Sequence, residues 1–187
     1  RNRKEGIGLV RAYSLHDVIF AGKDRYLTLQ DEKGRDVAHL RKTAPHGQVF
    51  SYTSADGQTV VSIRFIPGGR FAKSRYEVDA NENKYVLQGN AITNSVYFCI
   101  KGIIENHRIV LEENWAGDVE MKVNKQVAAI IRDYWGESRV VFGFEEAVEE
   151  HSLLFALHVL IYFMLKMYEK ENRYIDEVFS KVPQVKG

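Results

Sequence analysis

The stretch that decides the fold is His151–Tyr168, with the sequence HSLLFALHVLIYFMLKMY. It is the most apolar part of the chain, and between Ser152 and Leu165 only His158 and Tyr162 carry polar side-chain atoms. Leu, Met, Ala and Phe dominate and β-branched residues are few, which favours a helix over a strand. The run is also too long for a typical strand, so we predict a helix.

This helix is expected to be buried on all sides. A helix with no polar face lies either in a membrane or at the centre of a core. A spanning helix needs about 20 apolar residues, whereas the clean run here is shorter and contains His158. We therefore expect a core helix, and a protein anchored in a membrane by this helix is the alternative.

The bounds of the helix are predicted from charge and from proline. Acidic residues are favourable at a helix N-terminus, and four glutamates precede the apolar run: Glu145, Glu146, Glu149 and Glu150. We predict the central helix at residues 145–170, followed by a polar helical extension and tail at residues 171–187. Pro183 is expected to end the helical extension.

The sequence before the helix alternates between polar and apolar residues, as strands do. Three units of strand, Asp/Asn/Gly turn and strand cover residues 25–40, 49–65 and 76–89. Such units are typical of β-hairpins. Further strands are predicted at residues 9–10, 18–20, 96–101, 108–112, 119–123, 127–134 and 140–144. Turns spaced about 8 to 12 residues apart indicate an all-β sandwich or barrel.

The strands have an apolar face that must be buried, and the helix has an apolar surface on all sides that must be buried too. A closed antiparallel barrel leaves no exposed sheet edge, and a helix along its axis would fill the interior. We therefore predict a mainly β fold, in which a closed antiparallel barrel of about twelve strands surrounds a central hydrophobic C-terminal α-helix. This barrel domain is expected to span residues 5–170.

Composition narrows the classes of function. The chain has 187 residues, which suits one domain, and its 26 Lys and Arg nearly balance 25 Asp and Glu. Nothing global selects nucleic acid or an anionic surface as a partner. The single cysteine, Cys99, excludes an intrachain disulfide framework and is expected to be a small core residue. No signal peptide is visible, so we expect a cytoplasmic protein that can lie peripherally at a membrane.

No motif predicts catalysis, a metal or a cofactor. His151 and His158 share a helical face, but a spacing of seven residues separates them by about 10 Å along the axis, too far for one ion without other ligands. The chain has no G-x-S-x-G, Walker-type loop or H-E-x-x-H. We therefore expect no enzyme. The alternative is a small-molecule-binding barrel or enzyme with a ligand at the barrel mouth, which a helix along the axis disfavours.

The order of these elements resembles the tubby C-terminal-like superfamily, which includes the tubby domain, the plant LURP-one-related proteins and the phospholipid scramblases. The resemblance is carried by the repeated hairpin units, by Tyr85–Asn90 (YVLQGN), by Val127–Arg132 and by the terminal helix. It implies a barrel of about twelve strands around a hydrophobic helix. It also implies binding of phosphoinositides through a Lys-x-Arg stretch on the barrel surface.

The comparable segment here is Ile63–Val78, IRFIPGGRFAKSRYEV. Its cations surround Gly68–Gly69, whose backbone N–H groups could face a phosphate. The candidate headgroup-binding residues are Arg64, Arg70, Lys73 and Arg75. The expected partner is a phosphoinositide or an anionic membrane surface. Two alternatives are a protein partner for the barrel, and a charged hairpin that only deters edge pairing.

Overall fold

The computed structural model describes residues 10–16, 26–43, 49–68, 73–89, 97–134 and 139–180. Within the helix, side chains are described as far as Lys166. Twelve strands and one helix follow in chain order: β1 (Arg11–His16), β2 (Tyr26–Asp31), β3 (Asp36–Thr43), β4 (Val49–Ser54), β5 (Val60–Ile66), β6 (Arg75–Ala80), β7 (Asn83–Gly89), β8 (Cys99–Ile104), β9 (His107–Glu113), β10 (Val119–Val123), β11 (Gln126–Tyr134), β12 (Arg139–Phe144) and α1 (Leu153–Ser180).

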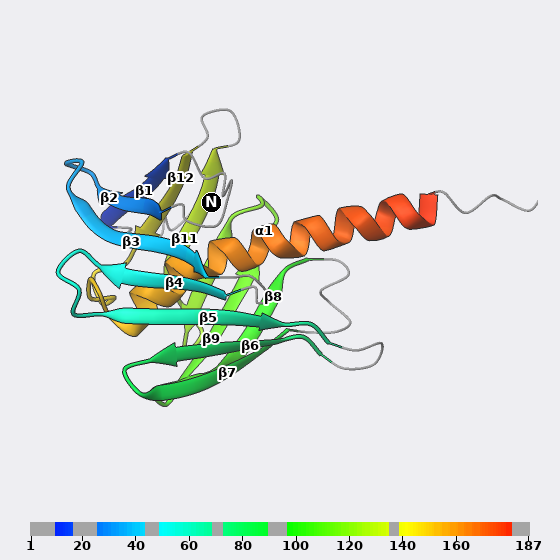
Figure 1. Cartoon of the computed structure of the whole chain (residues 1–187), viewed down its shortest axis with the longest axis horizontal. Coiled ribbons are helices and arrows are strands. Elements are labelled where there is room, and N and C mark those ends of the chain that lie inside the picture. Colours follow the sequence, from blue (N-terminus) through cyan, green and yellow to red (C-terminus); the bar gives the residue numbers. More distant parts are fainter. Residues whose placement is uncertain are drawn as a thin grey trace, which may run out of the picture.

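The strands form one closed antiparallel barrel, as predicted (Figure 1). Each strand pairs with its neighbours in the sequence, and β1 closes the barrel by pairing with β12 from Arg11↔Phe144 to His16↔Arg139. Alternation decides which side chains face inward. In β6, for example, Tyr76 and Val78 are buried, whereas Arg75 and Glu77, which alternate with them, are more exposed.

The first strand differs from the prediction. The expected strand at residues 9–10 is replaced by β1, in which Tyr13 and Leu15 point into the core. Val10 still donates a backbone hydrogen bond to Phe144 at 3.1 Å. The prediction rested on two consecutive apolar residues, Leu9 and Val10. It overlooked Tyr13 and Leu15, which alternate with polar residues as in a strand. The strand expected at residues 18–20 lies outside the described residues.

Three hairpins turn through two residues with positive φ. These pairs are Asn81–Glu82, Glu105–Asn106 and Asn124–Lys125. Positive φ at both central residues gives a turn whose twist matches that of the flanking strands. These turns join β6 to β7, β8 to β9 and β10 to β11, and so help to position the surface described below.

The helix begins later than predicted. It starts at Leu153, whereas residues 145–152, including the four glutamates, form turns that lead to it. His151 has a φ of 64°, which lies outside the helical region, so His151 and His158 do not share a helical face. Ser152 caps the helix: its Oγ accepts a hydrogen bond from the Phe155 backbone N at 3.2 Å. A short polar cap therefore replaces the expected acidic first turn.

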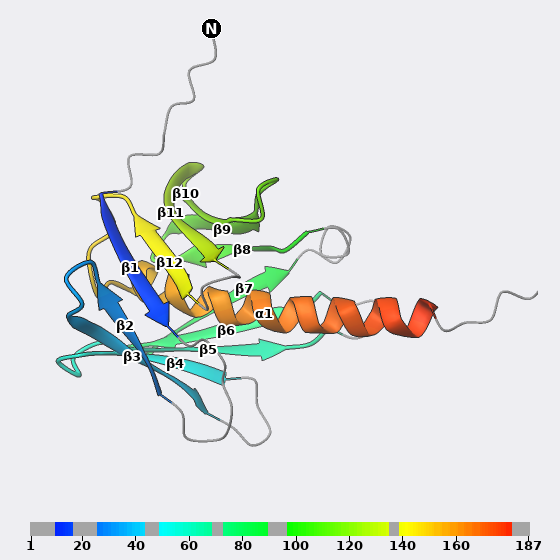
Figure 2. The same ribbon diagram turned by 90° about the horizontal axis from the view of Figure 1, so that it is seen from above.

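The helix runs through the barrel and extends beyond it (Figures 1 and 2). Every residue from Phe155 to Leu165 is buried, so the prediction of a central helix is confirmed. The rings of Phe155 and Phe144 stack with centroids 4.4 Å apart, and those of Phe163 and Phe50 at 4.9 Å. The backbone stays helical to Ser180, and Pro183 lies outside the described residues. In the described part of the chain, no helix has the length and apolar character needed to cross a bilayer.

Candidate functional site

Three of the four predicted headgroup-binding residues are described, and all three are exposed on or beside β5 and β6. Arg64 is exposed on β5, where it faces Glu77 of β6 across the ladder. Arg75 is exposed at the start of β6, between Ile66 of β5 and Gln88 of β7. Lys73 precedes β6 and is also exposed.

Arg70 and Gly69 lie outside the described residues. Lys73 is therefore the described member of the predicted set that lines the groove introduced next.

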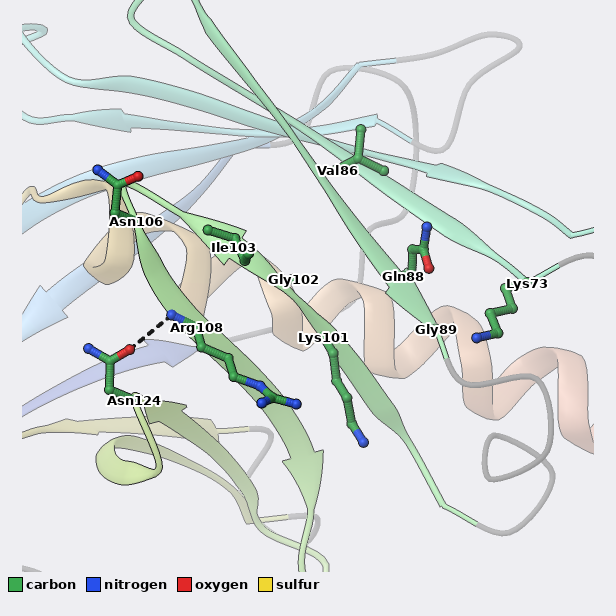
Figure 3. A pocket seen from close by; sticks show the side chains of 10 residues that line it. All are labelled: Lys73, Val86, Gln88, Gly89, Lys101, Gly102, Ile103, Asn106, Arg108 and Asn124. Carbon is green, nitrogen blue, oxygen red and sulfur yellow. Dashed lines mark hydrogen bonds between the residues drawn. The ribbon is translucent and has the colours of Figure 1, made fainter.

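An open groove of about 810 Å³ lies on the outer face of the barrel over β7, β8 and β9 (Figure 3). We call it the cationic groove. Its polar lining consists of three cations and three carboxamides: Lys73, Lys101, Arg108, Gln88, Asn106 and Asn124. Val86, Gly89, Gly102 and Ile103 complete it. No carboxylate is among these described lining residues, so the groove presents donors to an anion.

The register explains how these residues meet. Gln88 of β7 pairs with Lys101 of β8, and Ile103 of β8 pairs with Arg108 of β9. Side chains that alternate outward on neighbouring strands therefore converge on one surface. Figure 3 shows Lys101 and Arg108 extending from adjacent strands, with Lys73 beside the end of β7.

The groove lies over a short ladder between two neighbouring strands. The ladder between β7 and β8 contains only the pairs Gln88↔Lys101 and Gly89↔Ile100. Beyond Lys101 the two strands cross closely at Gly102, where an added Cβ would overlap Leu87 Cδ2 and lie 3.1 Å from the Val86 carbonyl oxygen. A side chain at position 102 would therefore have to displace Leu87 and press on the β7 backbone, so glycine suits this crossing. Val86 and Ile103, on either side of this crossing, line the cationic groove.

Asn124 fixes the strand that carries Arg108. Its Oδ1 accepts a hydrogen bond from the Arg108 backbone N at 3.0 Å, and its own backbone N donates to the Arg108 carbonyl at 2.9 Å. Asn124 reaches this position because its φ is 49°, which asparagine tolerates better than most residues. One turn residue thus positions the start of β9 while its side chain lines the groove.

The groove cations differ from the neighbouring lysine on β10. Lys122 lies 2.5 Å from Glu112 Oε1 and 3.5 Å from Glu120 Oε2, and these carboxylates raise its pKa. By contrast, none of Lys73, Lys101 and Arg108 has a carboxylate within ion-pair distance in the part of the chain that the structure describes. Their charge remains available to a ligand.

A second polar cluster joins the start of α1 to two strands of the barrel, β1 and β4. We call Tyr13, Tyr52, Glu150 and His151 the clasp. The Tyr13 hydroxyl donates to Glu150 Oε2 at 2.5 Å, and the Tyr52 hydroxyl lies 2.8 Å from His151 Nδ1. His151 Nε2 is 3.5 Å from Glu150 Oε1, so the four side chains form one connected network.

The tyrosines of the clasp stay protonated. Burial raises the pKa of Tyr13 far above its usual value, and the hydrogen bond to Glu150 raises it further. Burial, followed by the nearby charge of Glu150, does the same to the pKa of Tyr52. The Tyr13 hydroxyl therefore donates to Glu150, the Tyr52 hydroxyl shares a hydrogen bond with His151 Nδ1, and the clasp holds the beginning of the helix.

His158 is the buried histidine that the sequence places in the core. Its ring packs edge-on against Phe142 and Phe144, with centroids 6.4 and 5.4 Å away. Neither ring nitrogen has a partner with regular hydrogen-bond geometry among the described residues, and the nearby Ile130 backbone raises the pKa by less than burial lowers it. Burial lowers the pKa of His158 to about 3, so the ring is neutral at physiological pH.

Other candidate chemistry is sparse. Cys99 is buried, and burial raises the pKa of its thiol. Among the described residues, no three His, Cys, Asp or Glu side chains are grouped so that they could hold a metal ion.

Comparisons with family models, curated proteins and solved structures found no match. The properties of the site therefore come from its own residues. Sequence reasoning found Lys73 but missed Lys101, Arg108 and the carboxamides, because the register of β7–β9 brings them together. Two sequence features could have pointed to these residues: Lys101 alternates with apolar residues in its strand, and Asn106 marks a turn just before Arg108.

Proposed function

We propose that this chain is a non-catalytic, tubby-like binding domain whose cationic groove receives a phosphorylated headgroup at an anionic membrane surface. The observation that carries the proposal is the convergence of Lys73, Lys101 and Arg108 on one groove without a lining carboxylate. The whole chain has a formal net charge of only +1, so bulk charge does not account for this concentration of cations.

The lining supports a phosphorylated ligand. Lys and Arg supply charge-assisted hydrogen bonds to phosphate oxygens. Gln88 and Asn106 add neutral donors and acceptors that suit the hydroxyl groups of a headgroup, whereas the Asn124 carboxamide is engaged with Arg108 and His107. The closed barrel around a helix is also the architecture that the tubby resemblance implies.

An interior ligand is disfavoured by packing. The barrel axis is occupied by α1, whose residues from Phe155 to Leu165 are buried against the strands. A binding site on the outer face avoids displacing this core. The proposal therefore assigns the interior to stability and the outer face to recognition.

The test is co-sedimentation with liposomes that contain anionic lipid, with and without a phosphoinositide, at low and physiological salt. Each cation near an anionic surface contributes about 1 kcal/mol. Replacing Lys73, Lys101 and Arg108 together by Gln should therefore weaken binding about a hundredfold. Wild-type binding should fade as salt shortens the range of charge interactions.

A matched control removes the same charge elsewhere. Lys33→Gln, Arg35→Gln and Lys42→Gln together neutralise three cations on β2–β3, away from the groove. This control should bind like the wild type. A further variant, Arg64→Gln with Arg75→Gln, tests whether the surface extends onto β5 and β6. Equal losses in the groove variant and the β2–β3 control would overturn the proposal, as would wild-type protein that never sediments.

A further inference from the structure

The cationic groove has an apolar side that headgroup binding does not explain. Val86 of β7 is 48% exposed and Ile103 of β8 is 67% exposed. Isolated exposed apolar residues are ordinary on protein surfaces. These two, however, line the same groove as Lys73, Lys101 and Arg108.

The register places the apolar pair next to the cations. Val86 and Ile103 each lie two residues from the Gln88↔Lys101 pair, and so on the same outer face. That distance is about 7 Å along a strand. Arg108 faces Ile103 directly across the β8–β9 ladder. The groove therefore has a cationic end, toward which the Arg108 side chain extends in Figure 3, and an end with two exposed apolar side chains.

A ligand that satisfies both ends must itself be amphipathic and anionic. We infer that the groove docks on the lipid interface, with the headgroup at Lys73 and Lys101 and with Ile103 and Val86 inserted beside it. This inference rests on the proposed function and adds the orientation of the barrel on the membrane. Arg108 suits the boundary, because its apolar stem can lie along Ile103 while its guanidinium reaches a phosphate.

Another exposed apolar residue provides the contrast. Trp115 is fully exposed in the turn between β9 and β10. Its neighbours in the sequence include Glu113 and Asp118, whose negative charges oppose an anionic membrane. The inference therefore assigns membrane contact to Ile103 and Val86 rather than to the more exposed tryptophan.

The experiment compares three proteins on the same vesicles: wild type, Val86→Ser with Ile103→Ser, and Trp115→Ser. The double serine variant should bind anionic vesicles about tenfold more weakly, because apolar burial at the interface is lost. It should bind a soluble inositol phosphate as the wild type does. The Trp115→Ser control should match the wild type in both assays.

A direct readout of insertion uses an environment-sensitive dye on Ile103→Cys, since the native Cys99 is buried. The emission should shift to the blue with anionic vesicles and stay unchanged with the soluble inositol phosphate. If the wild type binds vesicles but the serine variant and the dye show no effect, the orientation is wrong and headgroup binding stands. If the wild type does not bind vesicles, both the orientation and headgroup binding are wrong. Both are also wrong if the dye responds to a polyglutamate peptide but not to vesicles, because that result would indicate a protein partner.

Discussion

The inside and the outside of the same barrel wall follow different rules. Inside, Ile100 and Leu111 are fully buried, so shape and apolar character decide the residue. Outside, Lys101 and Arg108 on the same two strands are exposed, and packing leaves their identity open. The residues of the inner face are therefore set by the fold, whereas we expect those of the outer face to be set by what the protein binds.

The strongest test of this contrast introduces one aspartate inside the barrel and, in a second variant, one aspartate on its outer face. Leu157→Asp or Leu160→Asp should unfold the domain, because either buries an unpaired carboxylate at the barrel axis. The expected cost, about 5 kcal/mol or more, is comparable to the whole stability of a typical domain. Thermal unfolding followed by far-UV circular dichroism measures it.

The matched control is Val60→Asp, which places the same charge on a half-exposed outward position of β5. It should change the free energy of unfolding by less than about 1 kcal/mol. A Leu157→Asp protein with wild-type melting would contradict the central-helix account.

The second test concerns the one fully buried histidine of the described core. Because the folded-state pKa of His158 is about 3 and that of an unfolded histidine is about 6.5, the unfolded state binds more protons between these values. Stability is therefore complete above pH 6.5 and should fall by about 1.4 kcal/mol per unit as the pH drops below it. Denaturant unfolding from pH 7 to pH 4 measures this loss.

His158→Leu should flatten this pH dependence, since the group that titrates is removed. His39→Gln is the control, because His39 is exposed on β3. Identical pH profiles for the wild type and His158→Leu would show that other groups govern acid stability.

The third test addresses the strand crossing below the groove. Gly102→Ala should cost about 1–3 kcal/mol, because the new methyl group meets Leu87 and the Val86 carbonyl oxygen. Adding Leu87→Val should recover part of this loss by removing the flexible end of the clashing side chain. Urea unfolding of both single variants and the double variant measures the coupling. Strictly additive losses would mean that the two residues do not meet.

The smallest effect is expected at the clasp. Tyr52→Phe removes one hydrogen bond to His151 and should cost about 1 kcal/mol. Because Tyr13 and Tyr52 belong to one network, their Phe variants should not be additive. The midpoint of urea unfolding checks both statements. Additive losses would divide the clasp into two independent pairs.

Much of the fold could be predicted from local sequence. Period-two alternation and Asn-rich turns gave most strands, and the uniformly apolar run gave the helix and its burial. The start of the helix was misplaced because glutamate is favourable near an N-terminus without fixing it. Ser152 and the left-handed conformation of His151 decide where the helix begins.

The candidate site was less predictable. Lys73 stood out because it belongs to a short basic segment, whereas Lys101 and Arg108 are single cations in separate strands. The β7–β8 and β8–β9 registers bring them together, and such registers depend on the whole barrel. The clasp was missed for the same reason, since Tyr13 and Tyr52 come from two strands that do not pair with each other, β1 and β4.

The most direct test of the central claim is a two-dimensional amide NMR titration of the whole chain with a soluble inositol phosphate. The account predicts that the signals of Gln88, Lys101, Arg108 and Asn124 move together, and that high salt reverses the change. Signals from β3 and β4 should stay in place. A spectrum that does not respond, or that responds at β3 and β4 instead of the groove, would contradict the assignment of anion binding to the β7–β9 face.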